Sequence, residues 1–381
     1  MEKVRLGDYI EEYSVRNKND ENLPVYSVTN TQGFCRDYFG KEVASKDKTT
    51  YKIVPKGCFA YNPSRINVGS VDWQRKEERV IVSPLYNVFA VSERLRQQYL
   101  YYYLKSNFAL QRIRSVATGS VRDNLKLEML KEFPIWLPSV EEQDAIVKKL
   151  DIVNEVINFR RQEILKLENL AQARFVELFG DPDNNEKSWD IDKMEHLCEV
   201  GSSKRIYQNE QSMEGVPFLR ISDLVNRIDT GSKKCDLYIP IEKFAELKEQ
   251  GLVPRSGDIL LTARGTLGRC YIVQSDDEFY FQDGMITWLS NYDRRITALY
   301  ISYLFEMPGF RKQIDALQAG STVAYMSISM TKKLNIMVPP IELQNQFADF
   351  VKQVDKSKDS VQKALDEAQL LFDSLMQQYF G

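Results

Sequence analysis

The chain has 381 residues, of which 43% are hydrophobic and 28% charged. This composition is typical of a folded globular protein and excludes a disordered or fibrous chain. The N-terminus lacks the apolar core of a signal peptide, and no apolar run reaches the about 20 residues of a membrane span, so we expect a cytoplasmic protein with no membrane partner.

The sequence offers little for hydrolytic or metal-dependent chemistry. Its five cysteines form no CxxC pair, which argues against structural zinc, and its one histidine, His196, lies in the charged stretch MEHLCEV. We interpret His196 as a half-exposed helix residue and the cysteines as buried thiols. Because GxxxxGKS/T and Asn/Asp-Pro-Pro-aromatic motifs are also missing, we predict no catalytic residue and no metal ligand.

Residues 1–136 are predicted to form a strand-rich globular part. Short apolar runs such as LPVYSV (23–28) and VPKGCFAY (54–61) stand beside Pro or Gly turns, as strands commonly do. Residues 1–134 carry 22 Lys and Arg against 16 Asp and Glu, a net charge of +6. A basic globular part suits a polyanionic partner such as DNA.

A long helix follows within residues 137–187. From Val140 onward, apolar residues recur at steps of three and four, and no Pro or Gly interrupts them before Gly180. About 40 residues at 1.5 Å each give a rod roughly 60 Å long. Pro138 lies just ahead of the helix, and Glu141 falls in the first turn, where the helix dipole favours a carboxylate.

The second half of the chain repeats the first. With a shift of 201 residues, segment 119–180 matches segment 320–381 without gaps, at 12 identities in 62 positions. The identities include Gly119-Ser120 with Gly320-Ser321, Pro138 with Pro339, Glu141 and Gln143 with Glu342 and Gln344, and Phe179-Gly180 with Phe380-Gly381. Upstream, the run VPFLRI (216–221) corresponds to LPVYSV, and VPRSGDILL (253–261) corresponds to VPKGCFAY. This pattern indicates an internal duplication.

The duplication predicts an α+β fold. Two mixed globular domains, residues 1–136 and 188–337, are separated by two long helices within 137–187 and 338–381. Each helix has one apolar stripe and needs a partner, so we expect the two to pair as an antiparallel coiled coil. The alternative is two separate core helices inside unrelated domains.

Candidate DNA contacts lie in loops that combine a cation, a small polar residue and glycine. Arginine and asparagine side chains can make bidentate hydrogen bonds to guanine and adenine, and main-chain N–H groups in Gly-Ser turns suit a phosphate. A turn residue or a surface ion pair is the alternative at each position. The candidates are Gln32, Arg65, Asn67, Ser120 and Arg122 in the first half, and Lys204, Arg205, Arg220, Arg264, Thr266 and Ser321 in the second.

Two variable globular parts, each closed by the shared Gly-Ser, Pro-x-x-Glu-x-Gln and Phe-Gly positions and a long helix, resemble the DNA specificity subunit of a type I restriction-modification enzyme. The stretch AQARFVELFGDP (171–182) adds to this resemblance. It implies two target recognition domains that read the halves of a bipartite, asymmetric double-stranded DNA site, with the paired helices setting the gap.

The resemblance also implies partners and cofactors outside this chain. Two modification subunits would bind S-adenosylmethionine and methylate adenine N6, and two restriction subunits, where present, would use ATP and Mg. Three other functions stay open: a coiled-coil interaction scaffold without nucleic acid, an enzyme with an unrecognised site, and a specificity subunit of another restriction class.

Overall fold

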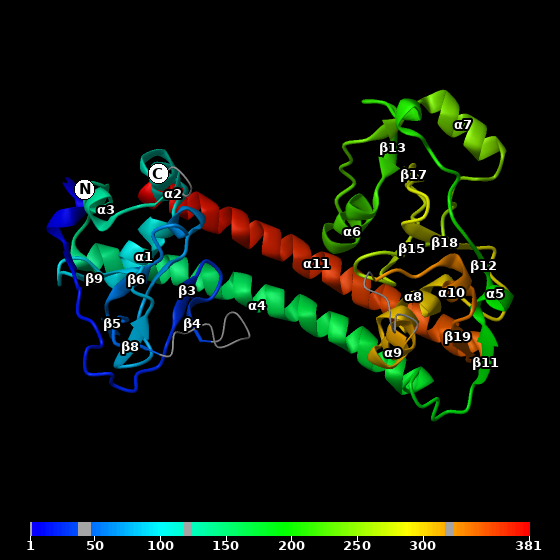
Figure 1. Cartoon of the computed structure of the whole chain (residues 1–381), viewed down its shortest axis with the longest axis horizontal. Helices are drawn as coiled ribbons and strands as arrows, with labels where there is room; N and C mark the ends of the chain where they lie inside the picture. Colours follow the sequence, from blue (N-terminus) through cyan, green and yellow to red (C-terminus); the bar gives the residue numbers. More distant parts are fainter. Residues whose placement is uncertain (1, 37–46, 118–123, 317–323) are drawn as a thin grey trace. The chain divides into compact units, whose positions relative to one another are not determined.

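The computed structural model describes residues 2–36, 47–117, 124–316 and 324–381. The chain forms two compact units (Figure 1). The first comprises Met1–Gln162 and Val361–Gly381, and the second comprises Glu163–Ser360. Each unit therefore contains one globular part together with segments of both long helices.

The first unit is built on a four-stranded antiparallel sheet in the order β2-β9-β6-β7. The inner strand β6, with sequence FAY, is buried at all three positions because both faces of the sheet are covered. Three two-stranded ladders, β1-β10, β3-β4 and β5-β8, complete the β structure. The bounds are β1 Glu2–Arg5, β2 Ile10–Glu12, β3 Ser27–Thr29, β4 Gly33–Cys35, β5 Lys52–Pro55, β6 Phe59–Tyr61, β7 Val71–Trp73, β8 Arg79–Val82, β9 Asn87–Val91 and β10 Pro134–Leu137.

Helices cover this sheet and close its core. They are the short helices η1 (Leu6–Asp8) and η2 (Ile66–Val68), followed by α1 (Gln97–Lys105), α2 (Asn107–Val116), α3 (Leu127–Lys131) and the 40-residue α4 (Val140–Phe179). Tyr99 and Tyr103 of α1 are fully buried, and their hydroxyl groups donate to the carbonyl oxygens of Trp136 (2.8 Å) and Pro134 (2.7 Å). These bonds fasten α1 to β10, since a buried hydroxyl group requires a partner.

The second unit repeats the sheet. Its four strands follow the order β12-β18-β15-β16, and β11 pairs with β19 as β1 pairs with β10. A three-stranded sheet, β14-β13-β17, is added to this frame. The bounds are β11 Asp190–Lys193, β12 Glu199–Gly201, β13 Val216–Leu219, β14 Tyr238–Ile239, β15 Ile259–Thr262, β16 Cys270–Ile272, β17 Tyr280–Phe281, β18 Ile286–Ser290 and β19 Asn335–Val338.

The helices of the second unit repeat those of the first at the predicted shift. α8 (Ala298–Glu306), α9 (Pro308–Ala316), α10 (Ile328–Lys332) and the 40-residue α11 (Ile341–Phe380) each begin 201 residues after α1, α2, α3 and α4. The remaining helices are α5 (Met194–Leu197), η3 (Gln208–Glu210), α6 (Ile221–Thr230) and α7 (Ile241–Glu249). The duplication thus extends over the globular parts, beyond the segment where identities are dense.

The two short upstream runs also correspond in the fold. Val25 of LPVYSV forms a parallel bridge with Ile81, and β13, which contains VPFL, pairs in parallel with β17. Gly57 and Gly257 each donate a main-chain hydrogen bond across the sheet, to Gln74 and Val273. The second pair of runs corresponds only in part, because Val54 and Pro55 belong to β5 whereas Val253 and Pro254 lie outside a strand.

The long helices pair in antiparallel fashion within each unit. In the first unit, Arg161 of α4 donates to Gln369 of α11 at 3.4 Å. In the second unit, Lys358 of α11 lies 2.9 Å from Glu168 of α4. Further along the second unit, Phe175 of α4 packs against Phe347 of α11, with ring centres 5.5 Å apart. Within this unit the partner numbers on α11 fall as those on α4 rise, so the predicted antiparallel pairing is confirmed and the alternative of two unrelated core helices is excluded.

The Phe-Gly ends of the helices have equivalent surroundings. Phe179, at the end of α4, packs 4.9 Å from the ring of Tyr300 in the second unit. Phe380, at the end of α11, packs 5.1 Å from Tyr99 in the first unit, and Tyr99 is the counterpart of Tyr300. Each long helix therefore begins next to one globular part, and the Phe at its end packs into the core of the other. This shared packing explains why Phe recurs at the two helix ends.

Candidate nucleic-acid interface

Arg65 stands on a turn directly after the inner strand β6. The Arg65 loop, residues 62–69, is closed by main-chain bonds from Arg65 to the Asn62 carbonyl (3.0 Å) and from Gly69 to that of Ile66 (2.8 Å). Gly69 has φ +86°, a conformation that side-chain-bearing residues rarely adopt, so glycine is needed there. Arg65 is exposed and Asn67 is half-buried. The Arg65 guanidinium thus projects from a fixed backbone.

Gln32 lies at the exposed tip of the β3-β4 hairpin. Its main-chain N–H donates to the Thr29 hydroxyl at 3.0 Å. On the other side of the tip, the N–H of Phe34 donates to the Asp72 carboxylate at 3.0 Å, and that carboxylate is almost fully buried. We call residues 30–34 the Gln32 turn.

The structure brings the Arg65 loop and the Gln32 turn to one cavity. This cavity has a volume of about 220 Å³, and Asn30, Asn62, Arg65 and Ser70 are among the residues that line it. Arg65 is therefore the one predicted contact of these two segments that lines the cavity, while Gln32 and Asn67 lie in the same segments outside it.

In the second unit, three segments meet at the turn Gln282–Met285. Arg205, which follows β12, makes an ion pair with Asp283 at 2.9 Å. Arg264, which follows β15, lies with Nη1 3.9 Å from the sulfur of Met285. The main-chain N–H of Gln282 donates to Leu219, the residue before Arg220. The structure therefore brings the loops of Arg205, Arg220 and Arg264 together.

The cations in this cluster differ in their freedom to contact a ligand. Arg220 caps α6, and its guanidinium binds the Asp223 carboxylate at 3.1 Å, a bond that raises the pKa of Arg220. Arg205 is held by Asp283. Lys204 and Arg264 are exposed, and within the described part of the chain neither makes an ion pair with a carboxylate.

Thr266 occupies an exposed position in the loop of Arg264. The loop is fixed by the N–H of Gly265 to Ala324 (3.4 Å) and by the N–H of Met326 to Ala263 (2.9 Å). Ser120, Arg122 and Ser321 lie outside the described residues.

Several functional neighbours were not predicted from the sequence. In the second domain, Asp283 contacts Arg205 and Met285 contacts Arg264. In the first domain, Asp72 accepts from the Gln32 turn, and Lys105 donates to both segments that line the cavity. Asp223 had a usable signal, because Arg220-Ile-Ser-Asp223 has the spacing of a helix cap. The others come from distant segments, such as Asp283, which is 78 residues from Arg205.

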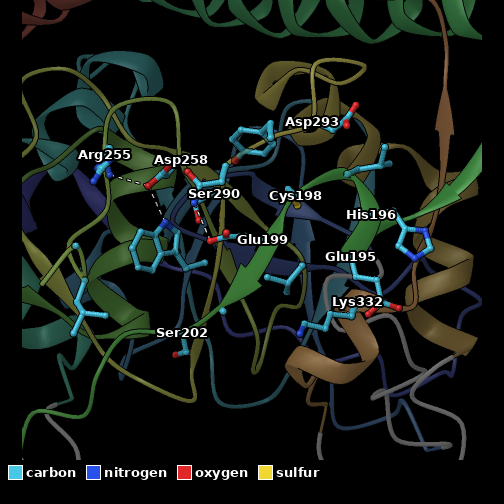
Figure 2. A pocket seen from close by; sticks show the side chains of 18 residues that line it. Glu195, His196, Cys198, Glu199, Ser202, Arg255, Asp258, Ser290, Asp293 and Lys332 are labelled. Carbon is cyan, nitrogen blue, oxygen red and sulfur yellow. Dashed lines mark hydrogen bonds between the residues drawn. The ribbon is translucent and has the colours of Figure 1, made fainter.

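A cavity of about 780 Å³ in the second unit runs along β12 (Figure 2). Its polar groups are largely paired with one another. The Asp258 carboxylate accepts bonds from Trp288 Nε1 and from the Arg255 N–H, both at 2.8 Å, and Asn291 donates to Glu199 at 2.8 Å. None of the predicted DNA contacts that the structure describes lines this cavity.

His196 and the cysteines have the surroundings of structural residues. His196 lies exposed on α5 with Nδ1 2.7 Å from Asp192. All five cysteines are free thiols; Cys58 and Cys198 are buried, and the other three are half-buried. The prediction of buried thiols is thus confirmed for two of the five.

In the ranges that the structure covers, no three His, Cys, Asp or Glu side chains gather as a metal site would require. None of the helices described there is both long enough and apolar enough to cross a membrane.

This architecture, with one sheet order repeated in two units and two 40-residue helices, defines a duplicated α+β protein. The family model for the type I restriction modification DNA specificity domain matches residues 2–169 and 186–369. The chain therefore belongs to the type I restriction-modification DNA specificity family, as the sequence motifs predicted.

Individual relatives agree with this assignment. The chain is 28% identical over 358 residues to a Haemophilus influenzae protein that carries the name of a type I restriction enzyme specificity subunit, covering 90% of this chain and 83% of the relative. Two solved structures share the fold across 100% of this chain. One belongs to a study of complex assembly and conformational transition of the type I R-M system (TM-score 0.58, 17% identity, 97% of that chain). The other is the type I S subunit from M. genitalium (TM-score 0.54, 16% identity, 96% of that chain).

Proposed function

We propose that this specificity subunit reads a bipartite, asymmetric double-stranded DNA site, one half with each target recognition domain, residues 1–136 and 188–337. The observation that carries the proposal is one sheet topology presenting two different sets of loops. After β6 the loop offers Arg65 and Asn67, whereas after β15 it offers Arg264 and Thr266. Different side chains on equivalent supports favour two different half sites.

The long helices are proposed to fix the unread gap between the half sites. Each helix has 40 residues, and their pairing brings rigidity that a single exposed helix lacks. Residues 137–187 and 338–381 are the proposed spacer segments.

A surface on α4 supports docking of a partner protein. Ile152, Val156 and Phe159 recur at steps of four and three on one helix face and are 52%, 42% and 59% exposed. Exposed apolar residues that adjoin one another on a surface favour a contact with a partner protein. We assign this surface, the α4 docking face, to a modification subunit, with two such subunits per complex and restriction subunits as an optional addition.

The chemistry is proposed to reside in those partners. S-adenosylmethionine and adenine-N6 methyl transfer belong to the modification subunit, and ATP and Mg belong to the restriction subunit. This chain is then a non-catalytic reader, whose loops offer planar hydrogen-bonding groups and cations for DNA.

A gel shift of the chain, alone and with a co-expressed modification subunit, tests this function. We expect DNA binding that weakens steeply with salt, because phosphate contacts release counterions. The chain alone, mixed with S-adenosylmethionine and DNA, should transfer no methyl group. Absence of DNA binding in the assembled complex would instead support an interaction scaffold, and methyl transfer by the chain alone would support an enzyme.

A further inference from the structure

Lys105, the last residue of α1, joins the two segments that line the cavity of the first domain. Its Nζ donates to the carbonyl oxygen of Asn30 at 3.1 Å and to that of Gly69. Asn30 begins the Gln32 turn, and Gly69 ends the Arg65 loop. One ammonium group therefore ties together two segments that are 39 residues apart in the chain.

Two further charged groups hold the outer sides of the same segments. The Asp72 carboxylate accepts from the N–H of Phe34 at 3.0 Å, at the far end of the Gln32 turn. Arg114 Nε donates to the carbonyl of Asn67 at 3.2 Å, within the Arg65 loop. Lys105 is the only one of the three that contacts both segments among the bonds of the described residues, so it links them directly.

The surroundings of Lys105 favour a structural bond over a contact with solvent. Its side chain is half-buried, with Nζ 5.5 Å from the centre of the Tyr101 ring. Burial lowers the pKa of Lys105, and the nearby Asp72 charge opposes that shift. Both carbonyl groups would lose a charged donor if the ammonium were removed, and hydrogen bonds to charged groups are the stronger kind.

In the second domain a different cation bonds to the corresponding loop, and the bond reaches that one loop. At the position equivalent to Lys105 the chain has Glu306, which cannot donate as a carboxylate. Instead, Arg311 of α9 donates from Nη1 to the carbonyl of Leu267, in the loop that carries Arg264 and Thr266. A cation from the helical layer thus holds the corresponding loop in both domains.

We propose that Lys105 is a positioning residue for base recognition, which places Gln32 and Arg65 so that both address the same half site. This inference rests on the proposed function of the first domain as a DNA reader. A bidentate contact tolerates little misplacement, so releasing the two segments should weaken discrimination between bases on the order of tenfold. Phosphate contacts are less directional, so affinity for unrelated DNA should change little.

The test uses the complex of the full chain with its modification subunit. Preference among duplexes randomised in each half site is measured for the original chain, Lys105→Met, Lys105→Arg and Arg311→Met. Lys105→Met should relax one half site about tenfold and leave the other unchanged, while Arg311→Met should relax only the other half. Lys105→Arg keeps a cationic donor and should retain most of the discrimination.

Each variant carries an internal control, because base preference at the half site read by the other domain should be retained. That retained preference shows that the complex is folded and binds DNA. Lys18→Met, which removes the same charge from an exposed position of the first domain, is the matched control and should leave both halves unchanged. Full discrimination in Lys105→Met, or an equal loss in both halves, would overturn the inference. If Lys105→Met yields no folded complex, the Lys105→Arg complex decides the test. A folded Lys105→Arg complex with no preference among the bases of that half site would also overturn the inference. A complex of the original chain with no half-site preference at all would instead refute the proposed function.

Discussion

Gln143 and Gln344 make the same three hydrogen bonds in the two copies of the duplicated fold. In each, Oε1 accepts from a main-chain N–H and Nε2 donates to two carbonyl oxygens, at 2.8 to 3.0 Å. The partners are Arg96, Arg94 and Pro138 for Gln143, and Thr297, Arg295 and Pro339 for Gln344. Both side chains are fully buried, so the Pro-x-x-Glu-x-Gln motif fastens the start of each long helix to its globular part.

Replacing Gln344 by Ala should destabilise the second unit. The change leaves buried polar groups without partners, which costs about 1–3 kcal/mol for each group that water does not reach. Hydrogen exchange of β15 and β18 should accelerate correspondingly. Gln362→Ala, on the exposed surface of α11, is the control and should leave exchange unchanged. Equal exchange in the two variants would show that the shared motif has no structural role.

Removing the ring of Phe380 should destabilise the first unit, although this residue lies at the opposite end of the chain. Phe380 is 2% exposed, and a buried Phe→Ala change costs about 3–5 kcal/mol. We expect faster hydrogen exchange in β6 and α1, with β15 unaffected. Leu370→Ala, at a position that is 72% exposed, should have no comparable effect. If Phe380→Ala left β6 unchanged, α11 would not be part of the first core.

The thiol of Cys198 should resist alkylation until the second unit unfolds. Burial raises the pKa of Cys198 to about 12, and the thiolate is the reactive form. At any one pH, modification of Cys198 by iodoacetamide should be much slower in the native chain than in urea, where the thiol is exposed and has its ordinary pKa of about 8.5. Mass spectrometry identifies the modified residue. Equal rates of modification in the native chain and in urea would contradict this burial.

A charge on the α4 docking face should prevent assembly. Phe159→Glu places a carboxylate in the proposed apolar contact, so co-purification with the modification subunit should be lost while the chain stays folded. Asn158→Glu adds the same charge at the adjacent exposed position and should assemble normally. Assembly of Phe159→Glu at the original affinity would assign the partner to another surface.

Shortening both helices should shorten the recognised gap. Deleting residues 163–166 and 357–360 removes about one turn, or roughly 6 Å, from each helix, which corresponds to about one to two base pairs. Both half sites should keep their bases. Replacing the same eight residues by Ala without deletion controls for their side chains. Altered half-site bases in the shortened chain would argue against a spacer.

The helices were predictable because their signals are local and repeated. Glu141 and Glu342 lie in the first helical turns as expected, and the apolar steps from Val140 continue to Phe179 without a break. The strands were harder to align, since most contain three to five residues and carry few identities. Their equivalence depends on pairing, such as β13 with β17, which involves residues over 60 positions apart.

The candidate site was predictable only in part. Exposed loop positions such as Arg65 and Arg264 follow from strand ends and glycines. The ion pair of Arg205 with Asp283 and the bonds of Lys105 to Asn30 and Gly69 join distant segments, so no spacing in the sequence indicates them. Residues 188–337 carry 18 Lys and Arg against 20 Asp and Glu, a net charge of -2. This sum does not indicate that Lys204 and Arg264 make no ion pair with a carboxylate among the described residues.

Sequencing of methylated adenines in cells that express this chain with its modification subunit tests the central claim most directly. The account predicts one split motif with two different halves and a constant gap, which disappears when the gene for this chain is deleted. A continuous or symmetric motif, or a split motif that persists without this chain, would contradict it.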